Sequence, residues 1–408
     1  MRIALLLLAL LSCAVAAAAD VPVVDNPRQA PRQTTVRYEE VWRAGADETA
    51  DYIFGVIGGA VADADGNVYL LDIQQQQVFK FSPNGDYLGL VSRKGEGPGE
   101  IDRCYVMRTW ADEGLGLLTS FPARITRVDF TGQSQGVITL GKVTGEDQSF
   151  LSGSDFAVRD GHLLASGRIM TYAEDGRTDT YFLSSFGPDG AELHSFGTKI
   201  RTAYDFSKTI VVDEVADFVG LQRWALGRDG EVYIAPERDA YLIEVRDAAG
   251  ELVRTIRRDF PPHRRTAEEK EKAKENYSFS ANMELPEIRY DIDDVSPPIS
   301  DLACVGDELL VASSDDTRDA LPDGVARSHD VFDLEGHLLE HRSHVLPLDP
   351  EEDTLTILPD GRAVRVANRQ SAYAASVADL NIQVGDEKLA GSDNDAMLEV
   401  IVYAPVAD

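Results

Sequence analysis

The residues of this sequence that could do chemistry are mainly carboxylates, and three of them surround one predicted turn. Asp63, Asp65 and Asp72 lie close together in the chain, and calcium binds where carboxylate oxygens cluster. Their neighbours do not match the loop of an EF-hand, however, and an Asp at a turn commonly accepts a hydrogen bond from its own backbone. Asp229 occupies the same turn position in a later segment. The sequence therefore favours a structural role for these residues and predicts no cofactor, with calcium as the open alternative.

A second candidate is the glycine-rich segment Gly-Glu-Gly-Pro-Gly-Glu at residues 95–100. Backbone N–H groups of such a segment can face an anion, but the segment lacks the Lys-Ser/Thr ending of a phosphate-binding loop. Glycine at Gly95, Gly97 and Gly99 permits unusual dihedral angles, and Pro98 stiffens the chain. We therefore expect a tight turn between two structural units.

The sequence has no recognisable catalytic constellation. It contains neither the Gly-x-Ser-x-Gly turn of a serine hydrolase nor the His-Glu-x-x-His pair of a zinc peptidase, and its seven histidines are scattered. His341 and His344 are three residues apart, so on a strand they would point to opposite faces, which is unsuitable for one metal. We expect the histidines at the surface. The sequence leaves catalysis undecided and favours a protein that is not an enzyme.

A repeated unit of four antiparallel strands positions these residues. In its first copy, two apolar strands meet at Asp65-Gly66 and two more meet at the turn that contains Gly85. Asp-Gly and Asn-Gly are strong hairpin signals because glycine accepts a positive φ. The fourth copy repeats the turn at Asp229-Gly230. Six copies of varying quality run through the chain, which indicates a repeat architecture.

One such unit exposes two faces and two edges, and radial stacking of several units buries the faces. The sequence thus predicts an all-β fold, a six-bladed β-propeller of four-stranded antiparallel blades. The last unit has no strand after 398–403, and the strand at 36–42 has no hairpin partner, so we expect the N-terminal strand to close the last blade. Residues 259–298 form an inter-blade insertion, in which a capping box at 266–269 predicts a short charged helix. This helix is either solvated or part of a lid over one face of the propeller.

The segments 65–72, 79–85, 95–100 and 241–258 are similar to those of a known group of proteins. They resemble the NHL-like six-bladed β-propeller proteins of bacterial envelopes, and the similarity covers nearly all of the mature chain. The resemblance implies a propeller fold and a place in the bacterial envelope. It implies no particular activity, because propellers host many unrelated functions.

Residues 1–19 read as a signal peptide, with a basic Arg2, an apolar run and a small-residue cleavage region. The predicted divisions of the chain are this leader, an N-terminal linker at 20–35 and the propeller at 36–408. No later apolar run is long enough to span a bilayer. We expect an exported protein, periplasmic or extracellular, with lipoprotein anchoring at Cys13 as the open alternative.

The composition limits the choice of partners. Of the 408 residues, 70 are acidic and 39 are Lys or Arg, which gives a formal net charge of -31 and argues against binding to nucleic acid. Hydrophobic residues make up 43% of the chain, which is enough for a large core. Cys104 and Cys304 remain after signal removal and fit neither a disulfide framework nor a zinc site. We expect two buried thiols, with one disulfide as the alternative.

The remaining candidate site is the funnel at one end of a propeller channel, where loops of neighbouring blades gather. There we expect a small molecule, a glycan or an envelope protein to bind without chemical change. The alternative is a metal-dependent lactonase-like hydrolase with a divalent cation on the axis. The candidate ligand-binding residues come from the first inter-blade loop (Arg93, Lys94, Glu100), from middle hairpins (Arg168, Arg238, Asp239) and from the residue before an inner strand (Asp301).

Overall fold

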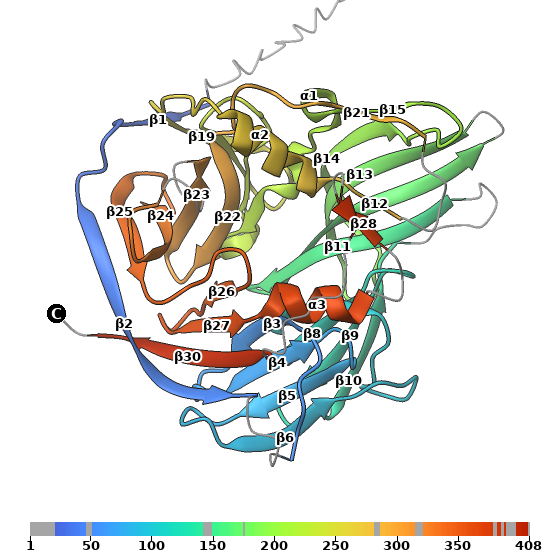
Figure 1. Cartoon of the computed structure of the whole chain (residues 1–408), viewed down its shortest axis with the longest axis vertical. Helices are drawn as coiled ribbons and strands as arrows, with labels where there is room; N and C mark the ends of the chain where they lie inside the picture. The colour runs from blue at the N-terminus through green and yellow to red at the C-terminus, as the bar shows by residue number, and fades with distance from the viewer. Residues whose placement is uncertain are drawn as a thin grey trace, which may run out of the picture.

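The computed structural model of the chain describes residues 21–45, 51–141, 149–173, 176–280, 286–314, 321–377, 382–384, 387–388 and 397–406. Across these residues the fold is all-β, and it is built from antiparallel sheets that follow one another along the sequence (Figure 1). None of the helices that the structure describes is both long and apolar enough to cross a membrane. The predicted signal peptide and Cys13 lie outside the described residues.

The first three sheets each contain four consecutive strands, and each strand pairs antiparallel with the next. The first sheet consists of β3 (Ile57–Ala62), β4 (Val68–Asp72), β5 (Gln77–Phe81) and β6 (Tyr87–Ser92). The second consists of β7 (Cys104–Trp110), β8 (Gly114–Thr119), β9 (Arg124–Asp129) and β10 (Ser134–Thr139). The third consists of β11 (Ser149–Arg159), β12 (His162–Ala173), β13 (Gly176–Phe186) and β14 (Glu192–Thr202). The strands of the third sheet are about twice as long as those of the first two.

The fourth sheet has a fifth strand that comes from the N-terminal segment. Its consecutive strands are β16 (Trp224–Leu226), β17 (Val232–Ile234), β18 (Leu242–Arg246) and β19 (Leu252–Arg258). Beyond β19, strand β1 (Val23–Asn26) runs parallel to it at the edge of the sheet. The predicted linker at 20–35 therefore contains a paired strand, since backbone groups along the edge of β19 offered it hydrogen bonds.

The last sheet has eight strands, and the N-terminal strand β2 (Gln33–Ala44) lies inside it. On one side of β2 are β25 (Leu338–Val345), β24 (Val325–Asp333), β23 (Glu308–Ser313) and β22 (Ile299–Val305). On the other side are β30 (Glu399–Pro405), β27 (Ala363–Ala367) and β26 (Thr354–Ile357). The first part of β2 is parallel to β25, and the second part is antiparallel to β30 (Figure 1). This confirms the predicted pairing of the N-terminal strand with the last strand.

Apolar clusters lie between each sheet and the next. Tyr69 and Leu117, for example, belong to the cluster that joins the first and second sheets, and comparable clusters join the second to the third, the third to the fourth, and the fourth to β22–β25. Trp42 of β2 packs with Phe81 of the first sheet. The first strands of successive sheets also contact one another, from β3 through β7, β11 and β16 to β22. The sheets are therefore arranged around a common axis, as in a β-propeller.

The hairpin turns have the geometry that their glycines predict. Gly66, Gly85 and Gly230 have φ angles of 82°, 91° and 78°, which an L side chain rarely adopts. At the first turn Asp63 accepts a hydrogen bond from the backbone N–H of Asn67 at 2.8 Å. A Cβ atom at Gly85 would lie only 2.7 Å from Cγ of Trp42, so this glycine also allows β2 to pack closely against the turn.

Asp72 has a structural role, and its partners lie beyond its own turn. The carboxylate is fully buried, and its Oδ1 accepts hydrogen bonds from the backbone N–H groups of Gln74 and Gln75 at 2.9 and 2.8 Å. Its Oδ2 accepts one from Gly55 at 2.6 Å. Within the described ranges, no three His, Cys, Asp or Glu side chains are grouped so that they could hold a metal ion.

The insertion at 259–298 contains the predicted helix, and it is attached to other segments. Helix α2 (Ala267–Ala273) begins with the predicted capping box, in which Thr266 and Glu269 exchange hydrogen bonds. In the same insertion, β21 (Ile288–Asp291) pairs with β15 (Ile210–Asp213), and β20 (Ser278–Ser280) pairs with β28 (Ile382–Val384). The other short elements are α1 (Glu214–Asp217), α3 (Arg369–Val377), β29 (Glu387–Lys388) and the 3₁₀ turns η2 (Gly220–Gln222), η3 (Arg228–Gly230) and η4 (Lys274–Asn276).

The seam between β2, β24 and β25 contains two buried histidines, so the expected surface position is wrong for both of them. His329 and His344 are 8% and 3% exposed, and their ring centroids lie 5.6 Å apart. His344 Nδ1 shares a hydrogen bond of 2.8 Å with the Tyr38 hydroxyl, whereas His341 Nδ1 lies 3.1 Å from an Asp330 oxygen. These different partners agree with opposite faces of β25. His344 is buried beside Tyr38 of β2, which pairs with β25 in the same sheet.

Burial keeps these two imidazoles neutral. Burial, together with the positive charges of Arg327 and Arg342, lowers the pKa of His329 to about 3 and that of His344 to about 4. His329 Nδ1 and His344 Nε2 have no hydrogen-bond partner among the described residues. The seam thus depends on histidines that remain uncharged.

Candidate functional site

The first strands of four sheets contain an irregularity at a similar distance from the end of the strand, four or five residues before its last residue. In each of β3, β7, β11 and β22, one residue is skipped in the pairing with the second strand of the sheet. Such a bulge bends a strand and changes the direction of the next side chain. In β11 and β22 the residue that follows the bulge is an aspartate, Asp155 and Asp301 respectively.

Asp155 and Asp301 have the same local structure on two different sheets. Oδ1 of Asp155 accepts a hydrogen bond from the N–H of Phe156 at 2.8 Å, and Oδ1 of Asp301 accepts one from the N–H of Leu302 at 2.9 Å. One oxygen of each carboxylate is thereby held by the backbone. The second oxygen of each carboxylate does not take part in this backbone contact.

Both carboxylates line one cavity of about 470 Å³, which lies between the first strands of the second, third and fourth sheets and β22. Arg108 comes from β7, Asp155 and Arg159 from β11, Trp224 from β16, and Asp301 from β22. Since these strands surround the common axis, the cavity is part of the central channel of the propeller. Its volume is suitable for a small organic molecule.

The charged side chains that line this cavity differ in their hydrogen-bond and ion-pair partners. Arg108 Nη2 donates to Asp155 Oδ2 at 2.8 Å and its Nη1 donates to the carbonyl of Met107 at 3.1 Å. Arg159 Nη2 donates to the carbonyl of Gly306 at 2.7 Å. Asp301, in contrast, forms no ion pair with any residue that the structure describes.

Asp301 is exposed to water, although protein atoms also surround its carboxyl group on several sides. This enclosure raises the pKa of its carboxyl group, because desolvation disfavours the charged form. The hydrogen bond from Leu302 and the charges of Arg327 and Arg108 act in the opposite direction, whereas Asp155 raises the pKa further. A titrating carboxylate in a cavity with a perturbed pKa is a candidate functional group.

The thiol in this cavity is unreactive. Cys304 and Cys104 are both free, which does not fit the alternative of a disulfide, and Cys104 is buried as expected whereas Cys304 is half-buried. Burial raises the pKa of each to about 12, so neither forms a thiolate at neutral pH.

The predicted residues of the first inter-sheet loop form a group of their own. Arg93 Nε lies 3.0 Å from Glu100 Oε1, and Glu100 Oε2 accepts the Gly97 N–H at 2.8 Å. These contacts lower the pKa of Glu100. A Cβ atom at Gly95 would overlap the same carboxylate. The loop is therefore folded around its own glutamate, as a tight turn, while Lys94 is exposed beside it.

Gly99 has a φ angle of 80°, a value that glycine adopts readily. The glycines of residues 95–100 and Pro98 therefore form the tight turn that the sequence predicts.

Arg168 does not lie in a middle hairpin, contrary to the sequence-based expectation. It lies within β12, where it is opposite Tyr181 of β13, and its Nη1 is 3.7 Å from Asp179 Oδ2. The expectation is wrong because the strands of this sheet continue for 11 or 12 residues, so the hairpin turn follows much later. Asp301 likewise lies inside strand β22 and not before it.

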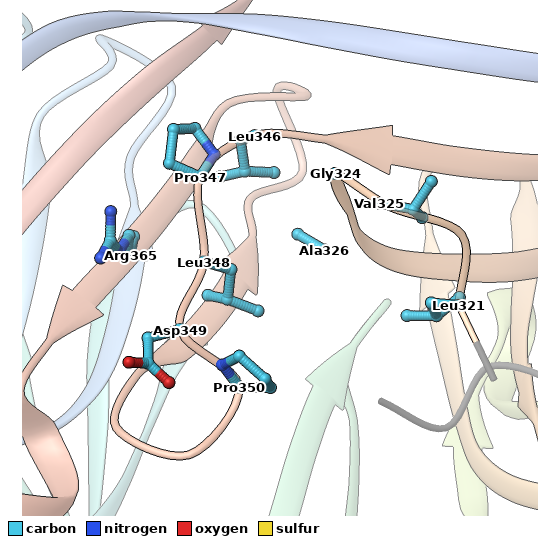
Figure 2. Close-up of a pocket in the computed structure, with 10 residues that line it drawn as sticks. All are labelled: Leu321, Gly324, Val325, Ala326, Leu346, Pro347, Leu348, Asp349, Pro350 and Arg365. Atoms are coloured by element: carbon cyan, nitrogen blue, oxygen red, sulfur yellow. The ribbon is translucent and has the colours of Figure 1, made fainter. Parts of the chain in front are cut away.

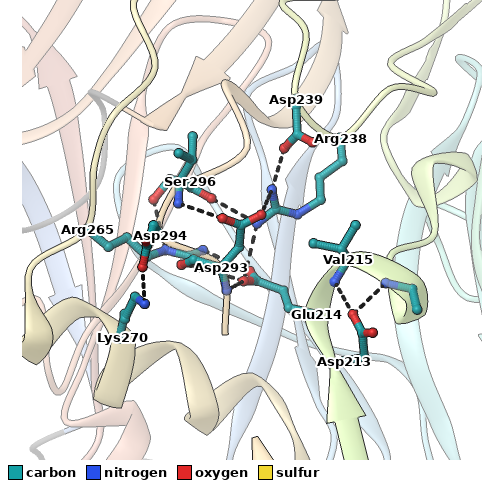
Figure 3. A network of polar contacts seen from close by, with 12 residues as sticks. Asp213, Glu214, Val215, Arg238, Asp239, Arg265, Lys270, Asp293, Asp294 and Ser296 are labelled. Atoms are coloured by element: carbon teal, nitrogen blue, oxygen red, sulfur yellow. Dashed lines mark hydrogen bonds and ion pairs between the residues drawn. The ribbon is translucent and has the colours of Figure 1, made fainter. Parts of the chain in front are cut away.

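Arg238 and Asp239 do lie between β17 and β18, as expected for a middle hairpin, but Arg238 is only 6% exposed. Its guanidinium contacts Asp239, Asp293 and Glu214 and donates to the carbonyl of Val295 (Figure 3). All four acceptors belong to the protein. The structure thus gives Arg238 a role in holding the insertion, and Asp239 is its exposed partner.

Glu214 is the centre of this network. It accepts two hydrogen bonds from Arg265, at 2.6 and 2.9 Å, and one from the backbone N–H of Asp293 at 3.0 Å (Figure 3). Burial would raise the pKa of Glu214, but these hydrogen bonds outweigh it and lower the pKa. The network joins α1, the hairpin after β17 and the insertion into one rigid structure.

A second cavity, of about 620 Å³, lies where β24, β25 and β27 meet (Figure 2). Its lining is mainly apolar, with Leu321, Leu346 and Leu348 beside Pro347 and Pro350. Of its two charged residues, Arg365 is already paired with buried Asp353 at 2.7 Å. This cavity therefore offers little polar chemistry to a ligand, and the channel is the better candidate site.

The predicted site residues thus fall into four separate groups, and only Asp301 lines the channel cavity. The sequence reasoning missed Arg108, Asp155 and Arg159. A signal was present, since Ser154-Asp155-Phe156-Ala157 and Ser300-Asp301-Leu302-Ala303 share the pattern Ser-Asp-apolar-Ala at equivalent places in two units.

No protein-family model matches the chain, and no curated protein matches it either. Similar solved structures include a protein of Bacteroides fragilis NCTC 9343 that is named as exported, with 11% identity over 94% of this chain and 100% of that chain and a TM-score of 0.45. A member of the duf4221 family from Bacteroides vulgatus ATCC 8482 has 8% identity over 92% and 100% of the two chains and a TM-score of 0.46. A calcium-binding regucalcin from Agrobacterium tumefaciens has 12% identity over 90% and 95% and a TM-score of 0.37. Because these scores are low, the propeller assignment rests on the strand pairing and the apolar clusters.

Proposed function

We propose that the chain is an exported, non-catalytic β-propeller of six blades that binds a small molecule in its central channel. Counting the two halves of the eight-stranded sheet on either side of β2 as separate blades gives six. The cluster that contains Trp42 and Phe81 joins the last strands to the first sheet, which supports a closed ring. This is the architecture of the NHL-like envelope proteins that the sequence resembles, and the predicted leader at 1–19 supports export.

The observation that carries the proposal is the channel cavity with Asp301 in it. Carboxylates from two sheets and a guanidinium from a third line the same space. One of these groups, Asp301, accepts a hydrogen bond from the backbone N–H of Leu302 and has no ion-pair partner in the described part of the protein. Convergent polar groups in a preformed cavity are typical of small-molecule sites. The cavity has an unreactive thiol, which favours binding over nucleophilic catalysis.

A thermal-shift screen of the mature protein, residues 20–408, tests this proposal. We expect compounds that bind in the channel to raise the melting temperature, and we expect Asp301→Ala to abolish the shift. Arg93→Ala is the control, since Arg93 lies in the first inter-sheet loop. A glycan or envelope protein bound on the funnel face would respond to Arg93→Ala instead. Hits that lose binding only in that variant would contradict the channel as the site.

The same assay distinguishes the alternative of a metal-dependent hydrolase. A large rise in melting temperature with calcium, reversed by EDTA, would support an axial cation and with it the enzymatic alternative. If binding to the channel is the function, small-molecule shifts persist in EDTA.

A further inference from the structure

Building on the proposed function, we infer that the ligand of the channel carries a positively charged ammonium group, which Asp301 binds with Asp155 beside it. The inference concerns the chemical class of the ligand. It follows from the charges and hydrogen bonds that the cavity already satisfies and from Asp301, a charged group of its lining with no ion-pair partner among the described residues.

The positive groups of the cavity are already engaged. Arg108 donates to Asp155 and to a backbone carbonyl, and Arg159 donates to the carbonyl of Gly306. An anionic ligand would have to displace these contacts. Among the described residues, Asp301 has only the backbone N–H of Leu302 as a donor, so its second oxygen is a charged acceptor that the structure leaves open. The group that complements an open carboxylate is a cationic donor.

The shape and lining of the cavity favour an organic cation over a metal ion. Two carboxylates, each with one oxygen held by the backbone, supply few of the six to eight oxygens that calcium takes. The wall beside Asp301 includes Ala303, Trp224 and Ala225, which can cover the hydrocarbon part of a ligand. A volume of about 470 Å³ exceeds what a hydrated ion fills and fits an aliphatic amine or diamine.

The charge of the whole molecule acts in the same direction. With a formal net charge of -31, the protein attracts cations and repels anions at low ionic strength. The electrostatic field of the whole molecule increases the rate of association with cations more than it increases specificity. The selection of one cationic ligand over another therefore depends on Asp301.

Binding of an ammonium group should also be linked to protons. A bound cation stabilises the ionised form of Asp301, whose pKa is raised in the free protein, and therefore lowers that pKa. The affinity should then fall as the pH decreases towards the pKa of the free carboxyl group. A neutral ligand that accepts a hydrogen bond from the protonated group would show the opposite trend.

Calorimetric titration of the mature protein with three matched probes tests the inference. The probes are putrescine, its neutral analogue 1,4-butanediol and the dianion succinate, each over a pH series. We expect putrescine alone to bind, with an affinity that increases with pH. Asp301→Asn should weaken it by about tenfold or more and remove the pH dependence. Asp65→Asn, which neutralises an exposed turn carboxylate, should leave both unchanged.

The results of these titrations distinguish a failure of the ammonium class from a failure of channel binding itself. Binding of the diol or of succinate with equal affinity, or unchanged putrescine binding by Asp301→Asn, contradicts the ammonium class and leaves a channel-binding protein in place. If no probe binds at millimolar concentration and the small-molecule screen also yields no channel hit, both are contradicted. The melting curve of Asp301→Asn shows whether the variant is folded, so a loss of binding is not confused with unfolding.

Discussion

Asp301 and Asp330 lie on strands of the same sheet, but their surroundings differ. Asp301 on β22 faces the channel, is reached by water and has no ion-pair partner in the described part of the chain. Asp330 on β24 is fully buried, accepts a hydrogen bond from the Tyr241 hydroxyl at 2.8 Å, and pairs with Arg258 and His341. A buried carboxylate is tolerated when its oxygens are paired. Both residues are aspartates, so the difference lies in their hydrogen-bond and ion-pair partners. A carboxylate with such partners supports the fold, and one without an ion-pair partner is a candidate for ligand binding.

Asp301 and Asp330 keep their surroundings only if the ring of sheets is intact. Removal of the closing strand β2 should therefore cause the largest decrease in the free energy of unfolding. Deletion of residues 20–43 removes β1 and nearly all of β2, which pairs with both β25 and β30 and carries buried Trp42. The loss should be about 5 kcal/mol or more, comparable with the whole stability of many domains, and is measured by chemical denaturation. Deletion of residues 20–32 is the control, because it removes β1 but keeps β2. Equal stability of the two deletions would contradict closure by β2.

The next largest effect tests the two aspartates directly. Asp330→Ala leaves Arg258 without its carboxylate partner and the Tyr241 hydroxyl without its acceptor, so we expect a loss of about 3–5 kcal/mol in the free energy of unfolding. Asp301→Ala removes a carboxylate with no ion-pair partner, and we expect no loss beyond about 0.5 kcal/mol. Urea denaturation of both variants at neutral pH measures the difference. If Asp301→Ala were as destabilising as Asp330→Ala, the channel carboxylate would be structural as well.

The third prediction concerns the two buried histidines of the seam, His329 and His344. Burial lowers the pKa of these basic groups, whereas it raises the pKa of a carboxyl group. The pKa values of His329 and His344 in the folded protein are about 3 and 4, below the ordinary value of 6.5. The unfolded chain therefore binds more protons as the pH falls below 6.5, and each histidine lowers stability by up to about 1.4 kcal/mol per pH unit. This loss continues until the pH reaches the folded pKa values.

Between pH 6.5 and 5, the double variant His329→Gln/His344→Gln should show a smaller decrease in stability than the wild type, because glutamine does not acquire charge. His337→Gln, at an exposed position, is the control. The neighbouring groups Tyr38, His341, Arg327 and Arg342 are unchanged in all three proteins. A parallel pH dependence of the double variant and the wild type would show that other groups cause the acid sensitivity.

The features that depend on residues close together in the sequence were predicted correctly. The turn at Asp65-Gly66 follows from the positive φ that glycine accepts, and the capping box at Thr266 follows from a spacing of three residues. Closure by the N-terminal strand was predictable because the last unit lacked a strand. The partners of Asp72 were not predictable in the same way, since one of them, Gly55, is separated from it by a whole strand.

The channel site was predicted only at Asp301, and the reason is the bulge. Whether an aspartate in an inner strand faces the channel depends on which residue is skipped in pairing with the next strand, and this register is a property of two strands together. Arg168 was misplaced for a related reason, because strand length in the third sheet is set by pairing across four strands. Asp155 would have required the comparison of two units whose equivalent aspartates, Asp155 and Asp301, are 146 residues apart in the sequence.

The smallest expected effect has the opposite sign to the others and concerns Asp301 alone. A carboxyl group whose folded pKa is raised contributes stability that is fully present below its unfolded pKa and is lost as the pH rises through the folded value. At neutral pH the ionised side chain of Asp301 therefore opposes folding slightly, and Asp301→Asn should stabilise the protein by a few tenths of a kcal/mol. In thermal denaturation the gain should grow as the pH rises above about 4, the ordinary pKa of an aspartate carboxyl group. A destabilised Asp301→Asn protein at neutral pH would mean that the carboxylate has a partner that supports the fold, and the contrast with Asp330 would then disappear.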